Sequence, residues 1–165
     1  MKVGTLKPAK KTTKKIKTPE PKKLTKTLIA LYGISNQGKT TTIRRVYDDL
    51  RLKYRVVRRG SPSRTEVNGA ILDIDGVLVG FASPGDVEWI LAANLLPLIE
   101  KGCIVILCAT HTRGGTVDLV ERVAADHQFA TVWIEKAGDS TDHIVANRRK
   151  ADEIIQRIRR AVEEA

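Results

Sequence analysis

The sequence predicts an α/β fold in which helices cover both faces of a mostly parallel sheet. Short apolar runs such as residues 28–32 and 103–109 alternate with longer segments whose apolar residues recur every three or four positions. Continuous apolar runs are typical of strands buried on both faces, and the longer spacing is typical of amphipathic helices. Their alternation predicts three layers, with one antiparallel pairing where Asp75-Gly76 joins two β-like runs.

The first half of the body predicts two strands around a helix. Residues 28–32 read as a buried strand that ends at Gly33. Residues 39–53 carry apolar side chains at helical spacing and predict an amphipathic helix. Residues 54–57 predict a short second strand, and the polar, turn-rich residues 59–69 predict the longest loop.

The second half repeats these patterns. Further strands are expected at residues 70–74, 77–82, 103–109 and 131–134, and helices at 87–100, through Val117, Val120 and Ala124, and in the C-terminal segment. Pro97 is expected to kink or end its helix, because proline removes a helical hydrogen bond. Asp142 is expected to cap the last helix, whose apolar face carries Ala151, Ile154, Ile155, Ile158 and Val162.

The charge of the chain is unevenly distributed. The formal net charge is +10, but residues 1–26 hold ten lysines against one acid, Glu20, whereas residues 27–165 hold 19 basic and 18 acidic groups. We therefore expect a disordered basic arm over residues 1–26 and a single nearly neutral domain over residues 27–165. No apolar run is long enough for a membrane span, and no apolar segment follows the basic start as in a secretory signal.

The two cysteines, Cys103 and Cys108, lie in one apolar run without metal-ligand spacing. They are expected to be buried, inert thiols, which fits a reducing cytoplasm.

The chemistry is concentrated in residues 33–40. Their sequence, Gly33-Ile34-Ser35-Asn36-Gln37-Gly38-Lys39-Thr40, matches the G-x-x-x-x-G-K-[ST] pattern and lies between a predicted strand and a predicted helix. Glycines allow such a loop to wrap an anion, and its amides and the helix N-terminus supply positive potential. Lys39 is expected to reach the β- and γ-phosphates of a nucleotide, and the Thr40 hydroxyl to bind Mg²⁺.

Through this motif the chain resembles the P-loop NTPase superfamily. Within that superfamily it resembles the small bacterial-type ATP-binding proteins. The resemblance implies a Rossmann-like sheet with the nucleotide at the carboxyl ends of the strands, near residues 33–42. The Gly38-Lys39-Thr40-Thr41 ending also resembles that of dimerising ATPases, which include ParA-like partition proteins and signal-recognition GTPases. This second resemblance implies that Thr41 is a further nucleotide-binding residue. It also implies that the chain could form a homodimer.

A second acidic group is needed to hold Mg²⁺ directly or through water. Asp86, after the run 77–82 and a Pro-Gly turn, is our preferred metal-site residue, with capping of the next helix as its alternative. Asp73 and Asp75 are rivals, although Asp75 also fits the first position of an Asp-Gly turn. Ser83 is a weaker candidate for contact with a phosphate or the attacking water.

The loop after residues 103–109 is another candidate, because ligands bind where parallel strands end. Arg113 is expected to stabilise charge on a transferring phosphoryl group, and Thr110 and Thr112 to donate hydrogen bonds. A plain polar loop is the alternative, and His111 fits a loop residue better than a general base. Arg148, Arg149 and Lys150 fit a solvated helix face better than a phosphate lid.

GTPases of the translation-factor and signalling type recognise guanine with an Asn-Lys-x-Asp run after a late strand. This chain has no such run, and Lys136 and Asp139 match it only in part. ATP is therefore favoured over GTP. We expect a nucleoside-triphosphate-binding and hydrolysing protein that acts as a switch. The alternatives are a small kinase, with Arg58, Arg59 and Arg64 in a lid, and a non-hydrolysing nucleotide-binding module. The basic arm predicts salt-dependent binding of nucleic acid without base stacking, since it holds no aromatic residue.

Overall fold

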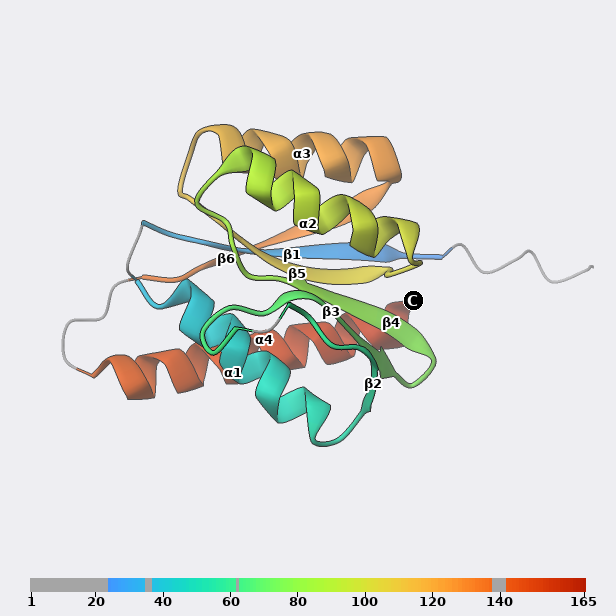
Figure 1. The fold of residues 1–165 in the computed structure, drawn as a ribbon, viewed down its shortest axis with the longest axis horizontal. Coiled ribbons are helices and arrows are strands. Elements are labelled where there is room, and N and C mark those ends of the chain that lie inside the picture. Colours follow the sequence, from blue (N-terminus) through green and yellow to red (C-terminus); the bar gives the residue numbers. More distant parts are fainter. Residues whose placement is uncertain (1–23, 35–36, 62, 138–141) are drawn as a thin grey trace, which may run out of the picture.

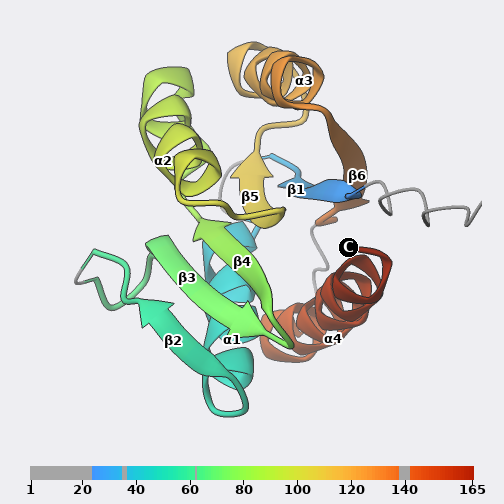
Figure 2. The same cartoon turned by 90° about the vertical axis from the view of Figure 1, so that its right-hand side faces the viewer.

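The computed structural model describes residues 24–34, 37–61, 63–137 and 142–165, which form a six-stranded sheet between two pairs of helices (Figures 1 and 2). The strand order is β2-β3-β4-β5-β1-β6. The strands are β1 (Lys26–Tyr32), β2 (Arg55–Arg58), β3 (Asn68–Ile74), β4 (Val77–Ala82), β5 (Val105–Thr110) and β6 (Phe129–Glu135). The predicted three-layer α/β fold is therefore confirmed.

The central part of the sheet is parallel. Strand β1 lies between β5 and β6, with Tyr32 opposite both Thr110 and Glu135, and β5 in turn pairs with β4 in parallel. The carboxyl ends of β1, β4, β5 and β6 consequently share one edge of the sheet. Ligands of open parallel sheets bind at that edge.

The β2 side of the sheet is antiparallel. Strands β3 and β4 form the expected hairpin, in which Asp75 and Gly76 adopt φ angles of 51° and 86°. Strand β2 also pairs with β3 in antiparallel fashion, with Arg55 opposite Asp73. We expected one antiparallel pair of strands, whereas the described sheet has two, so this count was wrong. The connection from β2 to β3 is a loop without a crossover helix, and such a connection reverses the chain direction.

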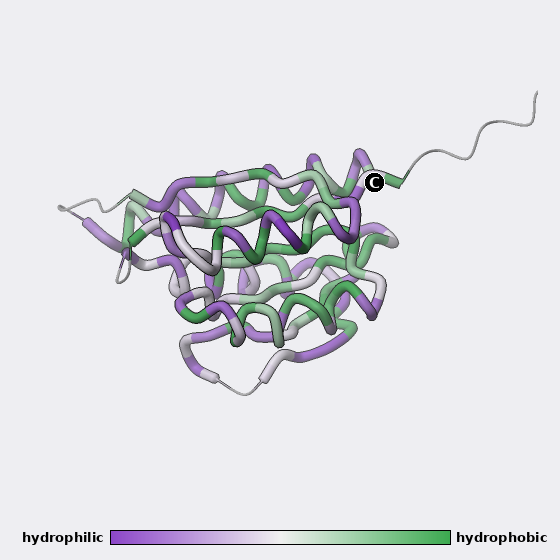
Figure 3. The backbone as a smooth tube through the Cα atoms, turned by 90° about the horizontal axis from the view of Figure 1, so that it is seen from above, coloured by the Kyte–Doolittle hydropathy of each residue, from purple (hydrophilic) through white to green (hydrophobic). Residues whose placement is uncertain are grey.

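Helices α1 (Lys39–Arg51) and α4 (His143–Glu164) cover one face, and α2 (Glu88–Glu100) and α3 (Gly115–His127) cover the other (Figure 2). Successive residues of β1 alternate between them: Ile29 and Leu31 belong to the core beneath α1 and α4, whereas Leu28 and Ala30 face α2 and α3. Figure 3 shows this layering as helices on which hydrophilic and hydrophobic residues alternate around more hydrophobic strands. The face predicted for the last helix is the buried one.

Three local expectations have clear outcomes. Asp142 caps α4, because its carboxylate accepts hydrogen bonds from the amides of Ile144 and Val145 at 3.1 and 3.2 Å. Pro97 does not end its helix, which continues to Glu100; only one amide is lost, and Leu95 and Leu98 on either side are fully buried. Both thiols are buried and free, and burial raises the pKa of Cys103 to about 11 and of Cys108 to about 12.

The start of the body lies slightly earlier than expected. Lys26, which we assigned to the arm, is the first residue of β1, and its Nζ donates a hydrogen bond to the carbonyl of His127 at 3.2 Å. Residues 1–23 of the expected arm lie outside the described residues. Within the described part of the chain, no helix combines the length and apolar character required to cross a membrane.

Candidate functional site

The loop that follows β1 begins at a position where only glycine fits. The Lys136 amide donates to the Tyr32 carbonyl at 2.7 Å, which brings the backbone after β6 against the end of β1. A Cβ on Gly33 would lie 2.6 Å from the Lys136 carbonyl oxygen. Gly33 therefore lets the chain leave the sheet directly at its carboxyl edge.

The same loop ends at Gly38, the N-terminal boundary of α1. Gly38 has a left-handed φ of 80°, and its carbonyl accepts from the Thr42 amide at 2.9 Å and the Thr42 hydroxyl at 2.7 Å. Gly38 offers no side-chain cap, and the first turn of α1 holds no acid. Among the described residues, the N-cap therefore offers no side-chain acceptor to the amides of that turn, and a helix start of this kind favours an anion.

Lys39 follows Gly38 at the end of the loop, and its side chain reaches back to the start of the loop. Its Nζ donates hydrogen bonds to the carbonyls of Gly33 at 2.6 Å and Ile34 at 2.9 Å, and the residue is 6% exposed. Burial lowers the pKa of Lys39 below its usual value of 10.5, and the negative charge of Asp86 partly opposes that shift. An anion that binds beside this buried ammonium group stabilises its positive charge.

Around Lys39 lies an open cavity of about 430 Å³, which we name the lysine cavity. Its volume is within the range of small-molecule sites. It is lined by Gln37, Gly38, Lys39, Thr40, Thr41, Asp86, His143 and Asn147. The structure thus brings five of the predicted nucleotide-binding residues together with the preferred acid, although Ser35 and Asn36 lie outside the described residues.

Asp86 reaches the cavity from the turn after β4. Its side chain is 73% exposed, and its Oδ1 lies 3.5 Å from the Nε2 of His111. The His111 Nε2 also lies 3.1 Å from the Asp86 carbonyl oxygen, which ties this turn to the loop after β5. Asp86 lies two residues before α2, whose N-cap is Val87, so the alternative helix-capping role is wrong.

The rival acids lie elsewhere. Because β3 runs antiparallel to β4, the end of β3 is at the sheet edge opposite the lysine cavity. There Asp73 accepts from the Gly76 amide at 2.8 Å and pairs with Arg55 at 2.9 Å. These two contacts lower the pKa of Asp73, the Arg55 hydrogen bond most. Asp73 and Asp75 therefore belong to the hairpin.

The oxygen-bearing pair Thr40 and Asp86 fits a magnesium ion, which prefers one or two protein oxygens together with phosphate oxygens and water. No group of three or more histidine, cysteine or acidic side chains is arranged around a metal position in the described ranges. The fit therefore rests on the shared cavity of the two side chains.

Arg113 is not in the lysine cavity. It lines a neighbouring hollow of about 480 Å³ with Ile34, His111 and Thr112. Two of the other candidates in this region have local roles. The Thr110 hydroxyl donates to the His111 carbonyl at 2.9 Å, and the Ser83 hydroxyl accepts from the Val67 amide at 2.8 Å. Arg113 thus shares a hollow with Ile34 of the predicted loop, and Lys39 does not line that hollow.

The sequence reasoning missed His143 and Asn147, which enter the cavity from the first turns of α4. Asn147 packs on Gly38, where a Cβ would lie 2.7 Å from its Oδ1, and that oxygen is buried with no hydrogen-bond partner within the described residues. Their i, i+4 spacing directly after the Asp142 cap was the available signal. Arg148 and Arg149 are exposed, and Lys150 pairs with Glu153 at 2.8 Å, as expected for a solvated face.

Comparison of the chain with protein-family models, with curated proteins and with solved structures finds no match.

Proposed function

We propose that this chain binds a nucleoside triphosphate, with Mg²⁺, in the lysine cavity and hydrolyses it. The observation that carries the proposal is the position of Lys39, whose Nζ is bonded to the Gly33 and Ile34 carbonyls in an otherwise open cavity. A buried ammonium beside an uncapped helix start is the arrangement that stabilises a chain of phosphates. The resemblance of residues 33–40 to the P-loop motif supports the same assignment.

In this proposal, Thr40 and Asp86, which both line the cavity, would hold the metal ion. When bound, Mg²⁺ neutralises the phosphate oxygens on which charge develops during phosphoryl transfer. Lys39 stabilises the same oxygens by donating hydrogen bonds, and the amides at the start of α1 orient them. Arg113 would have to move from its neighbouring hollow to contribute charge.

We propose ATP as the preferred nucleotide, because no guanine-reading Asn-Lys-x-Asp run follows a late strand. His143 and Asn147 are the described side chains that could distinguish the sugar or base, since they line the cavity beyond the phosphate-binding loop. The protein would act as a nucleotide switch in a reducing cytoplasm, as a monomer or a homodimer. The basic arm of residues 1–25 would hold an anionic partner such as nucleic acid.

Titration calorimetry with Mg²⁺ tests the binding step. We expect micromolar affinity for ATP, weaker binding of GTP, and a loss of at least about tenfold in Lys39→Ala, since a hydrogen bond to a charged group is worth about 1.5–3 kcal/mol. Lys53→Ala, which removes an exposed lysine just after α1, is the matched control. Absence of binding by any nucleotide, or equal losses in both variants, would contradict the proposal.

The fate of the γ-phosphate tests the reaction step. Hydrolysis predicts that label from [γ-³²P]ATP appears in inorganic phosphate in the presence of the protein alone. Transfer to an added hydroxyl compound would identify a kinase instead. Unchanged, bound ATP after long incubation would identify a binding module.

A further inference from the structure

A second cavity lies between α1 and the described residues 59–61 and 63–67. We name it the arginine cavity; its volume is about 440 Å³, similar to that of the lysine cavity. It is lined by Arg44, Tyr47, Arg51, Val56, Arg59, Gly60, Ser61, Ser63, Glu66 and Val67. None of these residues lines the lysine cavity, so the two are separate sites.

The described residues that form one wall are held by hydrogen bonds at both ends. At its start, the Ser61 amide donates to the Asn68 carbonyl at 2.9 Å. At its end, Val67 exchanges two hydrogen bonds with Ser83, each 2.8 Å long. In the middle, the Ser63 hydroxyl accepts from the Glu66 amide at 3.0 Å. A loop held in this way gives the cavity a preformed wall, which lowers the entropic cost of binding.

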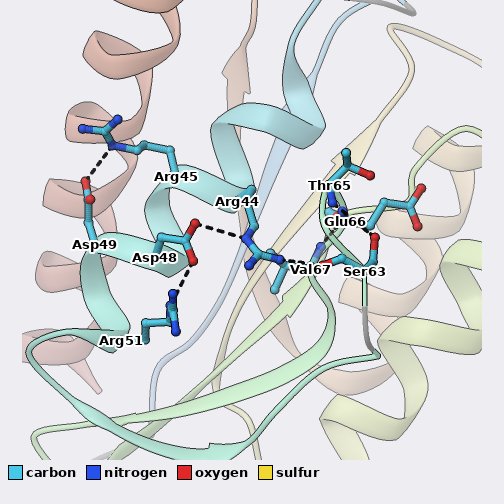
Figure 4. Close-up of polar contacts among 10 residues, drawn as sticks. Arg44, Arg45, Asp48, Asp49, Arg51, Ser63, Thr65, Glu66 and Val67 are labelled. Atoms are coloured by element: carbon cyan, nitrogen blue, oxygen red, sulfur yellow. Dashed lines mark hydrogen bonds and ion pairs between the residues drawn. The ribbon is translucent and has the colours of Figure 1, made fainter.

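The cavity is positively charged. Three arginines and one acid line it, and the nearest neutralising group outside the lining is Asp48. Asp48 accepts from the Nε atoms of Arg44 at 3.1 Å and Arg51 at 2.9 Å (Figure 4). Both arginines therefore keep terminal guanidinium nitrogens beyond this ion pair, although one of them, Arg44 Nη1, donates to the Ser63 carbonyl at 2.9 Å.

Arg59 adds a cation from the loop side. Its side chain is exposed and forms no hydrogen bond or ion pair with other described residues. Together with the hydroxyls of Ser61 and Ser63, it provides donors opposite α1. Guanidinium groups and hydroxyls converging on a preformed hollow are the donors that recognise a phosphate dianion.

The floor of the cavity is partly apolar. Tyr47 is 8% exposed, and its ring packs edge-on against Phe81, with the ring centroids 5.4 Å apart. The Arg51 guanidinium carbon lies 5.9 Å from the centre of the same ring. Val56 and Val67 complete this part of the lining. A ligand with an apolar or aromatic body and an anionic end matches both parts.

We propose that the arginine cavity binds a small phosphomonoester, with its phosphate at the arginines and its organic group on Tyr47. The cavity volume suits a small molecule. Thr40 of the lysine cavity and Arg44, Tyr47 and Arg51 of the arginine cavity follow one another at helical spacing, so they form one stripe along α1. Thr40 and Arg44 are one turn apart, about 6 Å along the axis.

Nuclear magnetic resonance of the full chain, titrated with inorganic phosphate and with phenyl phosphate, tests this proposal. We expect saturable amide shifts at Gly60, Ser61 and Ser63 with both probes, and tighter binding of phenyl phosphate because its ring contacts Tyr47. The amides of Gly38, Lys39 and Thr40 report the lysine cavity separately. Shifts confined to that second group would overturn the proposal while leaving nucleotide binding intact.

Two charge-matched variants localise the effect. Arg59→Gln should raise the dissociation constant of phenyl phosphate about tenfold, the loss expected for one charge-assisted contact. Arg45→Gln removes the same charge from α1, where Arg45 pairs with Asp49 at 3.3 Å and does not line the cavity. It should leave the constant unchanged. Equal effects in the two variants, or no effect of Arg59→Gln, would overturn the proposal.

Discussion

Gly85 lies directly against the backbone of Ala109. A Cβ at position 85 would overlap the Ala109 carbonyl oxygen and approach the Thr110 amide nitrogen to 3.0 Å. The turn after β4 therefore packs on the last residues of β5, and this contact sets the position of the next residue, Asp86. A close approach between two backbones requires glycine whatever its φ angle.

Gly85→Ala should consequently be destabilising. We expect a loss of about 2–3 kcal/mol in the free energy of unfolding, since either the turn or β5 must shift to admit the methyl group. Urea denaturation measures this loss. Gly69→Ala is the control, because Gly69 has a φ of 74° but nothing within 4 Å of its Cβ position, so only a conformational cost of about 1–2 kcal/mol is expected. A smaller loss in Gly85→Ala than in Gly69→Ala would contradict the packing argument.

Much of the fold could be predicted from the sequence because its local signals agree with the tertiary structure. The apolar run 28–32 lies in β1, which is buried on both faces, and Asp75-Gly76 forms the expected turn. The second antiparallel pair could not be predicted in the same way. Strand β2 is four residues long and mostly exposed, so its pairing direction leaves little trace in hydropathy.

The sequence predicts those residues of the candidate site that lie in one continuous segment. It does not predict those that come from distant segments and meet only in the folded chain. Residues 37–41 of the lining are contiguous, and the pattern of residues 33–40, with which they overlap, predicts an anion site without any tertiary information. Asn147 comes to Gly38 only because α4 follows β6, the neighbour of β1. The choice between Asp73 and Asp86 likewise depended on strand direction, which places the two acids at opposite edges of the sheet.

Asp86→Asn should weaken nucleotide binding only when Mg²⁺ is present. The substitution removes the charge of a carboxylate that lines the lysine cavity together with Thr40, while keeping the size of the side chain. Calorimetry with ATP in Mg²⁺ and in EDTA should show a loss of about tenfold or more in the first case and little change in the second, since charge-assisted contacts are worth about 1.5–3 kcal/mol. Asp118→Asn, in the exposed first turn of α3, is the control. Equal losses with and without metal would argue against a metal-site role for Asp86.

Asn147→Ala should separate binding from stability. The Asn147 Oδ1 is buried without a partner within the described residues, so its removal costs the fold no hydrogen bond made by that atom. We expect nucleotide affinity to fall several-fold, in line with one lost hydrogen bond of about 1 kcal/mol, and urea denaturation to show a smaller change. Asn94→Ala in α2, remote from both cavities, is the control. A stability loss with unaltered affinity would mean that Asn147 only packs against Gly38.

Removal of residues 1–23 should abolish nucleic-acid binding without affecting nucleotide binding. The remaining chain begins at Leu24 and keeps Lys26, which belongs to β1. Because the removed segment carries all nine lysines of residues 1–25, binding of the full chain should fall steeply with salt as counterion release requires. Fluorescence anisotropy with labelled DNA and RNA at several salt concentrations measures both effects. Equal binding by the shortened chain would refute a role for the arm.

Asp73 should give the hairpin an acid-sensitive contribution to stability. The Arg55 hydrogen bond and the Gly76 amide lower the pKa of Asp73 below its ordinary 3.8 in the folded protein. The unfolded state therefore takes up the proton first as the pH falls, so this contribution is present above pH 3.8 and disappears as the pH passes through the lower folded pKa. When the free energy of unfolding is measured against pH, Asp73→Asn should be less stable than the wild type above this pH range and equally stable below it.

Added salt should narrow the difference in stability between Asp73→Asn and the wild type, because Arg55 is 74% exposed. Asp75→Asn makes the same chemical change in the same hairpin and is the control, since Asp75 has a left-handed φ of 51° that asparagine tolerates. A parallel profile for Asp73→Asn at every pH would show that its charge does not stabilise the turn.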